Sequence, residues 1–414
     1  MAEQRKSVII TFKAKEKRPD KEKDKLEIVR AAIAQEAMPH FLDATSLPIG
    51  AGRPVLEDEA VGYDVNQYEA PIVSAKLLKS EMDVLRKNAN VANVEEDAPC
   101  YAIGSALQHL QIENQPAVMA ETIPVGVAQI LAPAAWGNSQ GKGIRVGVVD
   151  TGIDFNHPDL KTNYGGGMSF VPGAPTPLDD QGHGTHCAGT IAAAINGAGV
   201  VGVAPQASLY AVKVLDRNGS GQFSWVIAGI DWCIQNKMHI ISMSLGGSAA
   251  PTALQTICNV AWDRGLLIVA AAGNAQIQDP VPPAASNVGF PGKYKNVISV
   301  SAIDSGNVIT SFSSRGAEVD VCAPGLNVLS TAPGGGYATM SGTSMACPHV
   351  AGAAALTWGA HRFSNNEQIW NLLASTVDNL GMPGWDRLYG YGRVNANAAS
   401  GALVPPPTVP KRGV

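Results

Sequence analysis

Charged and aromatic side chains are both scarce in this chain of 414 residues, at 16% and 6% of the composition. The formal net charge of −5 provides no cationic surface for phosphates, so we expect no nucleic-acid partner. No apolar run approaches the roughly 20 residues that a membrane-spanning helix needs, and Ser7–Phe12 is too short for the core of a signal peptide. The sequence therefore predicts a globular protein that is soluble as given and enters no membrane.

Cysteine is also sparse, and the six cysteines are far apart with no C-x-x-C pair. This spacing argues against a small zinc module and against a dense disulfide framework, but it leaves one or two disulfides open. The cysteines are Cys100, Cys187, Cys233, Cys258, Cys322 and Cys347.

The charges crowd into the first quarter of the chain, since residues 1–103 hold 15 of the 30 Lys and Arg and 18 of the 35 Asp and Glu. Two differently built modules are the natural interpretation. In the first, apolar periodicity predicts strands at Ser7–Phe12, Glu69–Ala75 and Val91–Glu95, helices at Asp20–Gln35 and Leu77–Lys87, and a further strand between Leu42 and Val61. The resulting β-α-β-β-α-β order is that of a small ferredoxin-like α+β domain.

Beyond a connector at 104–132 the pattern changes to short, almost wholly apolar strands. They are predicted at Ile144–Val149, Ala207–Leu215, Ile240–Leu245, Leu266–Ala271, Val297–Ala302 and Val319–Ala323, with helices at Ser224–Gln235 and Thr252–Asp263. Such an alternation indicates an α/β domain whose mainly parallel sheet is covered on both faces, and ligands of these sheets bind beyond the carboxyl ends of the strands. The proline-rich tail at 404–414 is expected to be extended and outside the core.

Two candidate catalytic residues stand next to these elements. Asp150 directly follows the apolar run Ile144–Val149, so its carboxylate lies at the end of a buried strand, where it must be paired or must cap a helix. His183 lies in Gly182-His-Gly-Thr-His-Cys, and an imidazole held near a carboxylate acts as a general base near neutral pH. The alternative role of His183 is zinc binding with His186 and Cys187, which the missing H-E-x-x-H pattern disfavours.

Ser344 and Asn274 complete the candidate set. Ser344 leads into an alanine-rich helix, whose positive N-terminal potential stabilises a hydroxyl oxygen that gains negative charge, although an ordinary helix cap is the alternative. Its G-x-S-x-A context differs from the G-x-S-x-G elbow of α/β-hydrolase esterases. Asn274 ends another apolar strand, where its amide is suited to bind an oxyanion, although alone it would more often be a turn residue. With Asp150 and His183 they supply an orienter, a base, a nucleophile and an oxyanion donor.

These motifs resemble the subtilisin-like serine endopeptidases. The resemblance runs from about Ala120 to Ala399 and is carried by Asp150-Thr-Gly, His183-Gly-Thr-His, Ser242-Met-Ser-Leu-Gly-Gly, Ala271-Ala-Gly-Asn and Gly342-Thr-Ser-Met-Ala. It implies a three-layer αβα catalytic domain at 133–403, in which Asp150 orients His183 and His183 takes the proton of Ser344. Asn274 and the backbone N–H of Ser344 then stabilise the oxyanion.

The same resemblance assigns residues that bind the substrate. Two strand edges are expected to pair with an extended substrate, and small residues around the primary specificity pocket leave room for a large apolar side chain. We therefore expect cleavage after Leu, Met, Phe or Tyr. The edges are Ser244, Leu245 and Gly246 on one side and Gly219 and Gly221 on the other, and the pocket residues are Ala271, Ala272, Gly273 and Gly289.

Calcium is the structural ion that the resemblance implies. Oxygen ligands of the kind that calcium prefers are expected from Glu121, Asp159, Ala194, Asn196, Ala198 and Val200. Glu121 stands where the family often has glutamine. A weaker second cation site is expected at Gly292, Tyr294 and Asp320, with a salt bridge or a turn as the alternative.

Residues 1–103 resemble the inhibitory propeptide of the family, which also assists folding. The tail after Val94-Glu-Glu-Asp is expected to enter the cleft like a product, and the helices of the module to pack on the enzyme, with these carboxylates capping helix N-termini. The resemblance places self-cleavage at Ile103-Gly104. Met119-Ala120 is the competing site, because Ala120-Glu-Thr-Ile-Pro resembles a mature start.

The combined expectation is a calcium-stabilised, secreted, monomeric endopeptidase precursor that acts on proteins and peptides, cleaves itself and is inhibited by its propeptide until the propeptide is degraded. The absence of an export signal leaves an intracellular protease open. The rival hypotheses are a zinc hydrolase built on His183, His186 and Cys187 and a binding protein that keeps the fold without activity. If Cys187 is no ligand, it is expected to be a small buried side chain.

Overall fold

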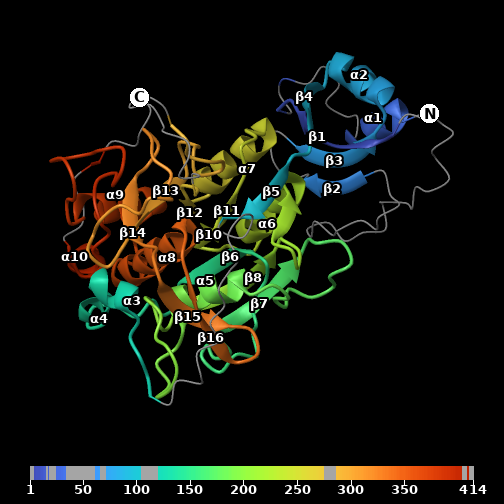
Figure 1. The fold of residues 1–414 in the computed structure, drawn as a ribbon. Coiled ribbons are helices and arrows are strands. Elements are labelled where there is room, and N and C mark those ends of the chain that lie inside the picture. The colour runs from blue at the N-terminus through green and yellow to red at the C-terminus, as the bar shows by residue number, and fades with distance from the viewer. Residues whose placement is uncertain are drawn as a thin grey trace.

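A computed structural model describes residues 4–14, 17, 25–33, 61–65, 71–103, 120–274, 286–402 and 408–409. A three-layer α/β domain makes up the larger part, and a smaller α+β module from the N-terminal part of the chain lies against it (Figure 1). Across the described ranges, every helix is too short or too polar to span a lipid bilayer.

Seven parallel strands form the central sheet of the larger domain. Their order across the sheet is β14 (Val321–Pro324), β13 (Ile298–Ile303), β12 (Leu267–Ala271), β10 (Ile240–Met243), β6 (Arg145–Asp150), β8 (Ser208–Lys213) and β7 (Tyr164–Ser169). Successive residues face opposite layers, so Val148 and Val149 of β6 belong to two different hydrophobic clusters. Because both faces are covered, the strands are apolar on both sides, as the sequence predicts.

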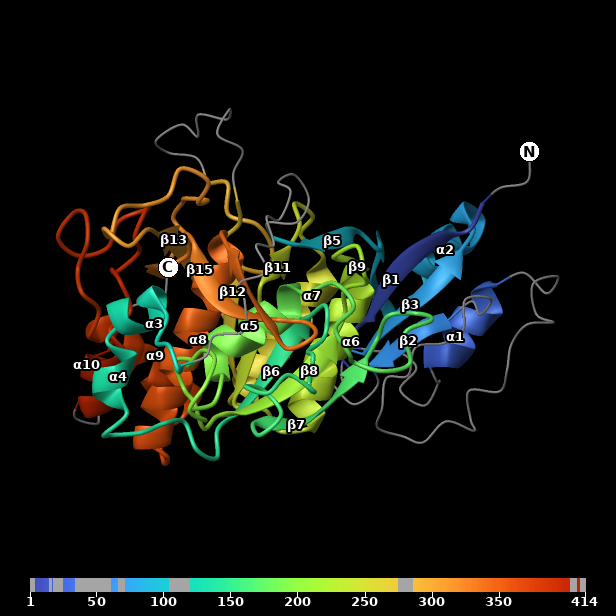
Figure 2. The same ribbon diagram turned by 60° about the horizontal axis from the view of Figure 1, so that its bottom comes forward.

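Helices cover both faces of this sheet (Figure 2). On one face lie α5 (His183–Ala192) and α8 (Thr343–Ala360), and on the other α6 (Phe223–Gln235) and α7 (Thr252–Asp263). The shorter helices on the α8 side are α3 (Val125–Gln129), α4 (Ala132–Ala135), α9 (Asn366–Ser375) and α10 (Ala396–Gly401). A hairpin of β15 (Val328–Ala332) and β16 (Gly336–Met340) packs on α5.

The N-terminal module has the predicted β-α-β-β-α-β order. Its antiparallel sheet runs β2 (Val61–Val65), β3 (Ile72–Leu77), β1 (Lys6–Phe12), β4 (Val91–Glu96), and its helices are α1 (Lys25–Ala32) and α2 (Lys79–Lys87). β2 begins at Val61, where the stretch in which a strand was expected ends. Its sequence Val-Gly-Tyr-Asp-Val has no continuous apolar pattern, which is why the strand was not located more closely. Residues 42–60 of that stretch lie outside the described residues.

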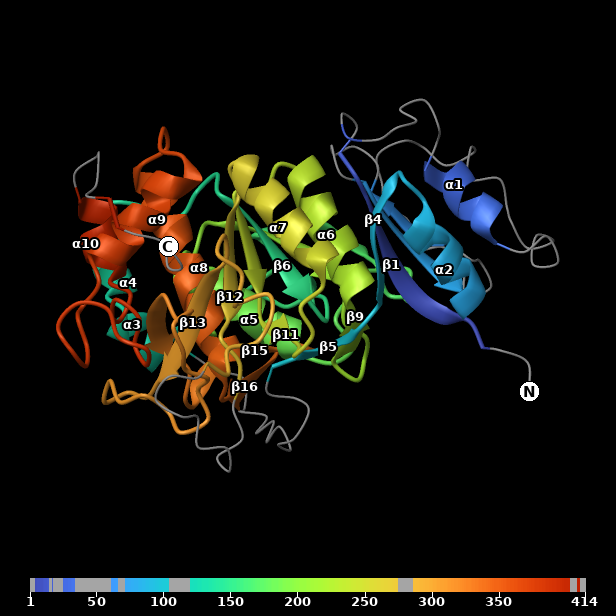
Figure 3. The same cartoon turned by 90° about the horizontal axis from the view of Figure 1, so that it is seen from above.

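The sheet of this module, not its helices, faces the larger domain, so the prediction that its helices pack there is wrong. β2 lies against α6 (Figure 2) and β1 contacts α7. The helices α1 and α2 lie on the far side of the small sheet (Figure 3). β1 is apolar on both faces: Val8 and Ile10 pack in the core of the module, and Ile9 packs in the cluster that includes α6 and α7. Both sides of this sheet are therefore covered.

Two segments of the larger domain differ from the sequence prediction. β7 was not expected, because its sequence Tyr-Gly-Gly-Gly-Met-Ser has no apolar alternation, and it lies at the edge of the sheet. In the tail, the N–H of Val409 donates to the side chain of Asn371 at 2.9 Å and Val409 packs on the main core, so at this point the tail is not outside the core.

All six cysteines are buried and free. The disulfides that the sequence left open are therefore not formed, and the fold is held by its large apolar core.

Candidate active site

The candidate catalytic residues come from separate elements that meet at one edge of the sheet. Asp150 ends β6, His183 begins α5, Ser344 is the second residue of α8, and Asn274 follows β12. Gly182 has a φ of 113°, a left-handed conformation that favours glycine, which lets the chain turn sharply into His183.

Asp150 and His183 form a buried hydrogen-bonded pair. Nδ1 of His183 lies 2.8 Å from Oδ1 of Asp150, and each side chain is 1% exposed. The backbone N–H of Thr151 donates to the same Oδ1 at 2.7 Å. A proton on Nδ1 held by the carboxylate leaves Nε2 as the acceptor of the ring, and Nε2 is buried without a hydrogen-bond partner among the described residues.

Charge sets the protonation behaviour of this pair. Burial by itself lowers the pKa of His183, but the charge and hydrogen bond of Asp150 outweigh it and hold the pKa well above the usual 6.5. Burial also raises the pKa of Cys187, so this neighbouring thiol is uncharged and Asp150 is the charge that acts on the ring. The imidazole is therefore a stronger base than a free histidine.

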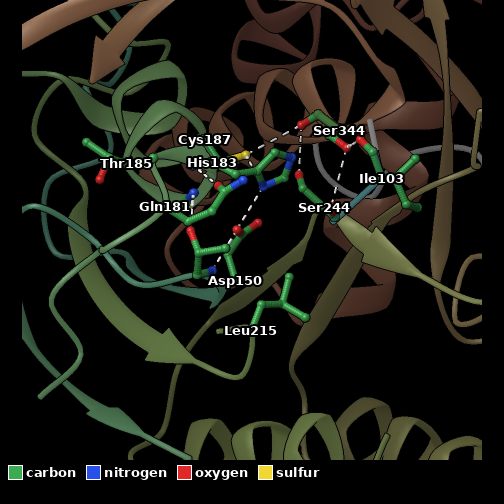
Figure 4. A network of polar contacts seen from close by, with 12 residues as sticks. Ile103, Asp150, Gln181, His183, Thr185, Cys187, Leu215, Ser244 and Ser344 are labelled. Carbon is green, nitrogen blue, oxygen red and sulfur yellow. Dashed lines mark hydrogen bonds and ion pairs between the residues drawn. The ribbon is translucent and has the colours of Figure 1, made fainter. Parts of the chain in front are cut away.

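Ser344 faces a carbonyl group of the N-terminal part of the chain. Its Oγ donates to the backbone oxygen of Ile103 and lies 3.3 Å from the backbone oxygen of Ser244 (Figure 4). In this view the ring of His183 lies between Asp150 and Ser344, although its Nε2 makes no hydrogen bond with the hydroxyl. In this structure the hydroxyl of Ser344 is therefore hydrogen-bonded to the carbonyl of Ile103 and not to the imidazole of His183.

Asn274 is oriented by the residue before the serine. Its Oδ1 accepts the backbone N–H and the hydroxyl of Thr343, each at 3.0 Å, so its Nδ2 points elsewhere. Nδ2 and the carbonyl oxygen of Ile103 lie 3.2 and 3.3 Å from the point where a β-carbon on Gly342 would stand. The amide donor and the carbonyl therefore border the same small space, as an oxyanion site requires.

Both predicted strand edges pair with one segment, β5 (Pro99–Ala102), which lies between β11 (Leu245–Gly246) and β9 (Ser220–Gln222). On one side Leu245 pairs with Ala102, and on the other Gly221 pairs with Cys100. The N–H of Ala102 donates to Gly219 at 2.8 Å, and that of Ile103 donates to Ser244 at 3.2 Å. The cleft thus holds residues 99–103 as the middle strand of three.

Three of the predicted pocket residues lie close together, since Gly273 and Ala272 both lie beside Gly289, and the side chain of Ile103 lies next to Gly246 of the strand edge. A β-carbon on Gly246 would lie 2.8 Å from the carbonyl oxygen of Phe290 and 3.1 Å from Cδ1 of Ile103, so any larger residue there would narrow the space and shift the backbone. The N–H of Gly289 donates to the carbonyl of Ala272 at 2.9 Å, and Gly273 receives the N–H of Ser314 at 2.8 Å. Ala271, the last residue of β12, is part of the main core behind them.

The predicted zinc set is not assembled. Nε2 of His186 lies 2.9 Å from the carbonyl of Val328 and 3.1 Å from that of Ala338, away from His183. Burial lowers the pKa of His186 to about 3, so it is neutral. Within the described ranges, the three metal-capable side chains that gather are Asp150, His183 and Cys187, with donor atoms within 4.8 Å of one another.

The six predicted calcium ligands gather around the loop 194–200. Oε1 of Glu121 accepts the N–H of Asn196 at 2.6 Å. Asp159 accepts the side-chain amide of Asn196 at 2.9 Å through Oδ1 and the N–H of Val200 at 3.0 Å through Oδ2. Two carboxylates thus border one loop, a donor set that fits a hard cation such as calcium.

The other two predicted ligands belong to the same loop. The N–H of Ala194 donates to the carbonyl of Asp159 at 2.8 Å, and that of Ala198 donates to the side-chain oxygen of Asn196 at 3.0 Å. Asn196 therefore turns its nitrogen toward Asp159, and an ion next to that carboxylate requires the amide to reverse.

The weaker cation site is less well formed. Oδ2 of Asp320 accepts the N–H of Ser299 at 2.8 Å, and the carbonyl of Tyr294 accepts the N–H of Val297 at 3.1 Å. Gly292 lies nearby, since a β-carbon there would be 3.3 Å from Oγ of Ser299. These contacts agree with the alternative of a structural turn.

Sequence reasoning missed residues that hold the site together. Thr343 orients Asn274, Thr151 donates its N–H to Asp150, and Lys213 donates to the carbonyl of Thr151. The signal for Lys213 was available, because it is a charged residue in an otherwise apolar strand. Asp97 was included only as part of an acidic run, yet its carboxylate binds the first turn of α6.

A serine, an imidazole and a carboxylate at the strand ends of a three-layer α/β domain, with an extended peptide paired across them, define the class of serine peptidases. The chain belongs to the subtilase family, whose model matches residues 141–392. It is a subtilisin-like serine endopeptidase, and its substrates are proteins.

Curated relatives are similar over most of their length. The chain is 46% identical to subtilisin E of Bacillus subtilis (strain 168) over 329 residues, which are 79% of this chain and 80% of that protein. It is 49% identical to subtilisin of Bacillus pumilus over 283 residues, 68% of this chain and 100% of that protein. It is 43% identical to an alkaline protease of Alkalihalobacillus alcalophilus over 347 residues, 83% of each chain.

Proposed function

We propose that the chain is the precursor of this endopeptidase and that residues 1–103 are its inhibitory propeptide. The observation that carries the proposal is the position of β5 as the middle strand of the cleft, with the carbonyl of Ile103 on the hydroxyl of Ser344. A substrate bound for hydrolysis has this arrangement.

The proposed chemistry uses the four residues in the roles that the sequence suggests. Ser344 turns its hydroxyl proton to Nε2 of His183 and attacks the carbonyl carbon, while Asp150 holds the opposite side of the ring and stabilises the imidazolium. Asn274 and the N–H of Ser344 donate to the oxyanion. His183 then protonates the leaving amine, and water resolves the acyl-enzyme by the same route.

Self-cleavage is proposed between Ile103 and Gly104. Ile103 already reaches the nucleophile through its carbonyl, whereas Thr122, close to the competing site at Met119-Ala120, pairs with Val200 in the predicted calcium loop. Residues 104–119 lie outside the described residues. The new end at Ile103 would remain in the cleft as a product and block it.

Two carboxylates of the module support the proposed inhibition, because they cap helices of the larger domain. Glu95 accepts the N–H groups of Thr252 and Ala253 at 3.0 and 2.9 Å at the start of α7. Asp97 accepts the N–H and the hydroxyl of Ser224 at 3.0 and 2.6 Å in α6. Neither helix has a side-chain cap of its own, so removal of the module leaves both N-termini unsatisfied.

Calcium binding, the preferred residue before the scissile bond and secretion are part of the same proposal. Calcium at the loop 194–200 would cross-link Glu121 and Asp159 and stabilise the fold. A pocket walled by glycine and alanine supports cleavage after large apolar residues. A module that blocks the cleft is of use to an enzyme that is exported before it is activated, so the proposal includes secretion, and it also includes a monomeric state.

The Ser344→Ala variant tests the proposal. It should accumulate as a single 43.0 kDa chain, whereas the wild type should release a fragment that starts at Gly104. Fluorophosphonate should label mature wild type at Ser344 and leave the variant unlabelled. Processing of the variant at the wild-type rate would contradict self-cleavage, and a fragment that starts at Ala120 alone would select the competing site.

A further inference from the structure

Lys213 carries a buried positive charge on the strand next to the one that ends at the candidate catalytic carboxylate. It ends β8 opposite Asp150, which ends β6, and its side chain is 1% exposed. Its Nζ donates to the carbonyl of Thr151 at 2.5 Å, to Oδ1 of Asp180 at 2.6 Å and to the carbonyl of Leu215 at 3.1 Å. The three protons of the ammonium are therefore all used.

Through Thr151, Lys213 is connected to the orienting carboxylate. Thr151 receives the ammonium at its carbonyl and donates its own N–H to Oδ1 of Asp150 at 2.7 Å. Its hydroxyl accepts the N–H of Gly184, in the first turn of α5, at 2.9 Å. Displacement of Thr151 would thus disturb both the carboxylate and the helix that carries the base.

Through Asp180, Lys213 is connected to the turn that leads into His183. The next residue, Gln181, accepts the N–H of His183 on its side chain at 2.8 Å. The preceding residue, Asp179, is buried and accepts N–H groups from Gly182 at 2.9 Å and Thr185 at 2.9 Å, which fixes the start of α5. Asp180 is the member of this turn that reaches the ammonium.

The energetics make this connection specific. A buried ammonium costs several kcal/mol unless it is paired and fully hydrogen-bonded. Within the described residues, Asp180 is the carboxylate that pairs with Lys213, and its own side chain is half exposed. The ion pair between Asp180 and the buried ammonium of Lys213 therefore holds the turn before His183 in one position.

We propose that Lys213 and Asp180 are positioning residues for catalysis: their ion pair sets the distance between the carboxylate of Asp150 and the imidazole of His183. The hydrogen bonds of the ammonium go to Thr151, Asp180 and Leu215 and not to Ile103 in the cleft, so the proposed effect on a substrate is indirect. The inference rests on the proposed roles of Asp150 and His183.

Asp180→Asn and Lys213→Met test the inference in the mature enzyme. Asp180→Asn keeps an oxygen acceptor and removes the charge, and Lys213→Met removes the ammonium at similar volume. The matched control is Asp378→Asn, because Asp378 forms an equally short and partly exposed ion pair at 2.6 Å with Arg393, which pairs with Cys322 of the outermost strand β14 and not with β6 or β8. Concentrations of active enzyme come from fluorophosphonate titration, and circular dichroism verifies folding.

For Asp180→Asn and Lys213→Met we expect kcat to fall about 10-fold with KM unchanged within about twofold, because a misplaced base slows chemistry and leaves binding intact. The low-field proton resonance of Nδ1 of His183 should shift or broaden in both variants. Asp378→Asn should behave like wild type in both measurements.

The inference is overturned if Asp180→Asn keeps wild-type kcat and an unchanged low-field resonance, or if the loss lies in KM. If Lys213→Met does not fold, the kcat and the resonance of Asp180→Asn are sufficient for the test, because Asp180 is half exposed and its substitution is compatible with folding. A separate variant tests the proposed roles of Asp150 and His183: if His183→Ala retains activity, these roles are wrong whatever the result for the ion pair.

Discussion

Asp97 gives the sharpest test of how the N-terminal module is held on the enzyme. Replacing it with alanine removes the two hydrogen bonds from Ser224 that cap α6, and inside the module it removes the 3.1 Å hydrogen bond from the hydroxyl of Ser7. Loss of a helix cap costs about 1 kcal/mol, and a charged acceptor adds about 1.5 kcal/mol. Burial penalises this carboxylate and raises its pKa above the usual 3.8, which returns part of the loss. The net change is about 2 kcal/mol, or roughly 30-fold weaker binding of the module.

The assay uses the self-cleaved complex, which is diluted into a fluorogenic peptide, so that the concentration at which activity appears reports dissociation. Glu96→Ala is the matched control, because Glu96 pairs with Lys6 inside the module and both side chains are about 60% exposed (61% and 62%). It should change binding by less than about twofold. Asp97→Asn retains an acceptor and should bind more tightly than Asp97→Ala. Equal binding by Asp97→Ala and wild type, or an equal loss in Glu96→Ala, would refute the reasoning.

Three further outcomes are expected. The imidazole of His183 must be neutral to accept a proton, and its pKa is raised, so kcat/KM should fall as the pH decreases through a value above 6.5. Asp150→Asn removes the charge that raises this pKa, so in a pH profile of the variant the fall in kcat/KM should occur at lower pH. Gly246→Val would fill the space next to Ile103, and its β-carbon would also push against the carbonyl oxygen of Phe290. Peptides with Phe before the scissile bond should lose about 100-fold in kcat/KM relative to Ala peptides measured on the same folded variant, and equal losses would contradict the assigned pocket. Chelation should lower the unfolding temperature by several degrees and added calcium should restore it, with no such effect in Asp159→Ala, as calorimetry can check.

The sequence predicted those helices and strands whose apolar pattern lies within the element itself. The six apolar strands of the sheet and helices α6 and α7 follow from short Val/Ile/Ala runs and helical periodicity, and Asp150, His183 and Ser344 stand at the ends of elements that such patterns locate. Parallel sheets bring strand ends to one edge, so the meeting of these residues was also predictable.

Features that depend on distant partners were not predictable in the same way. The pairing of β5 in the cleft was expected from the resemblance and not from a pattern in its four residues, because it is a strand through β9 and β11, which lie more than a hundred residues away and flank it. The glycine-rich β7 likewise needs β8 beside it. Which face of the N-terminal module meets the enzyme depends on Ile9, whose partners lie on other elements. Pattern alone shows that β1 is apolar, but not what covers each side.

The position of β5 has a consequence for which polypeptides can be digested. The bound segment β5 pairs through its backbone with β11 on one side and with β9 on the other. A chain that replaces β5 must therefore offer several consecutive residues whose backbone N–H and C=O groups are free on both sides. Helices and interior strands of native proteins have no such free edges. Digestion rates should therefore report how often a target protein locally unfolds, more than which side chains it contains.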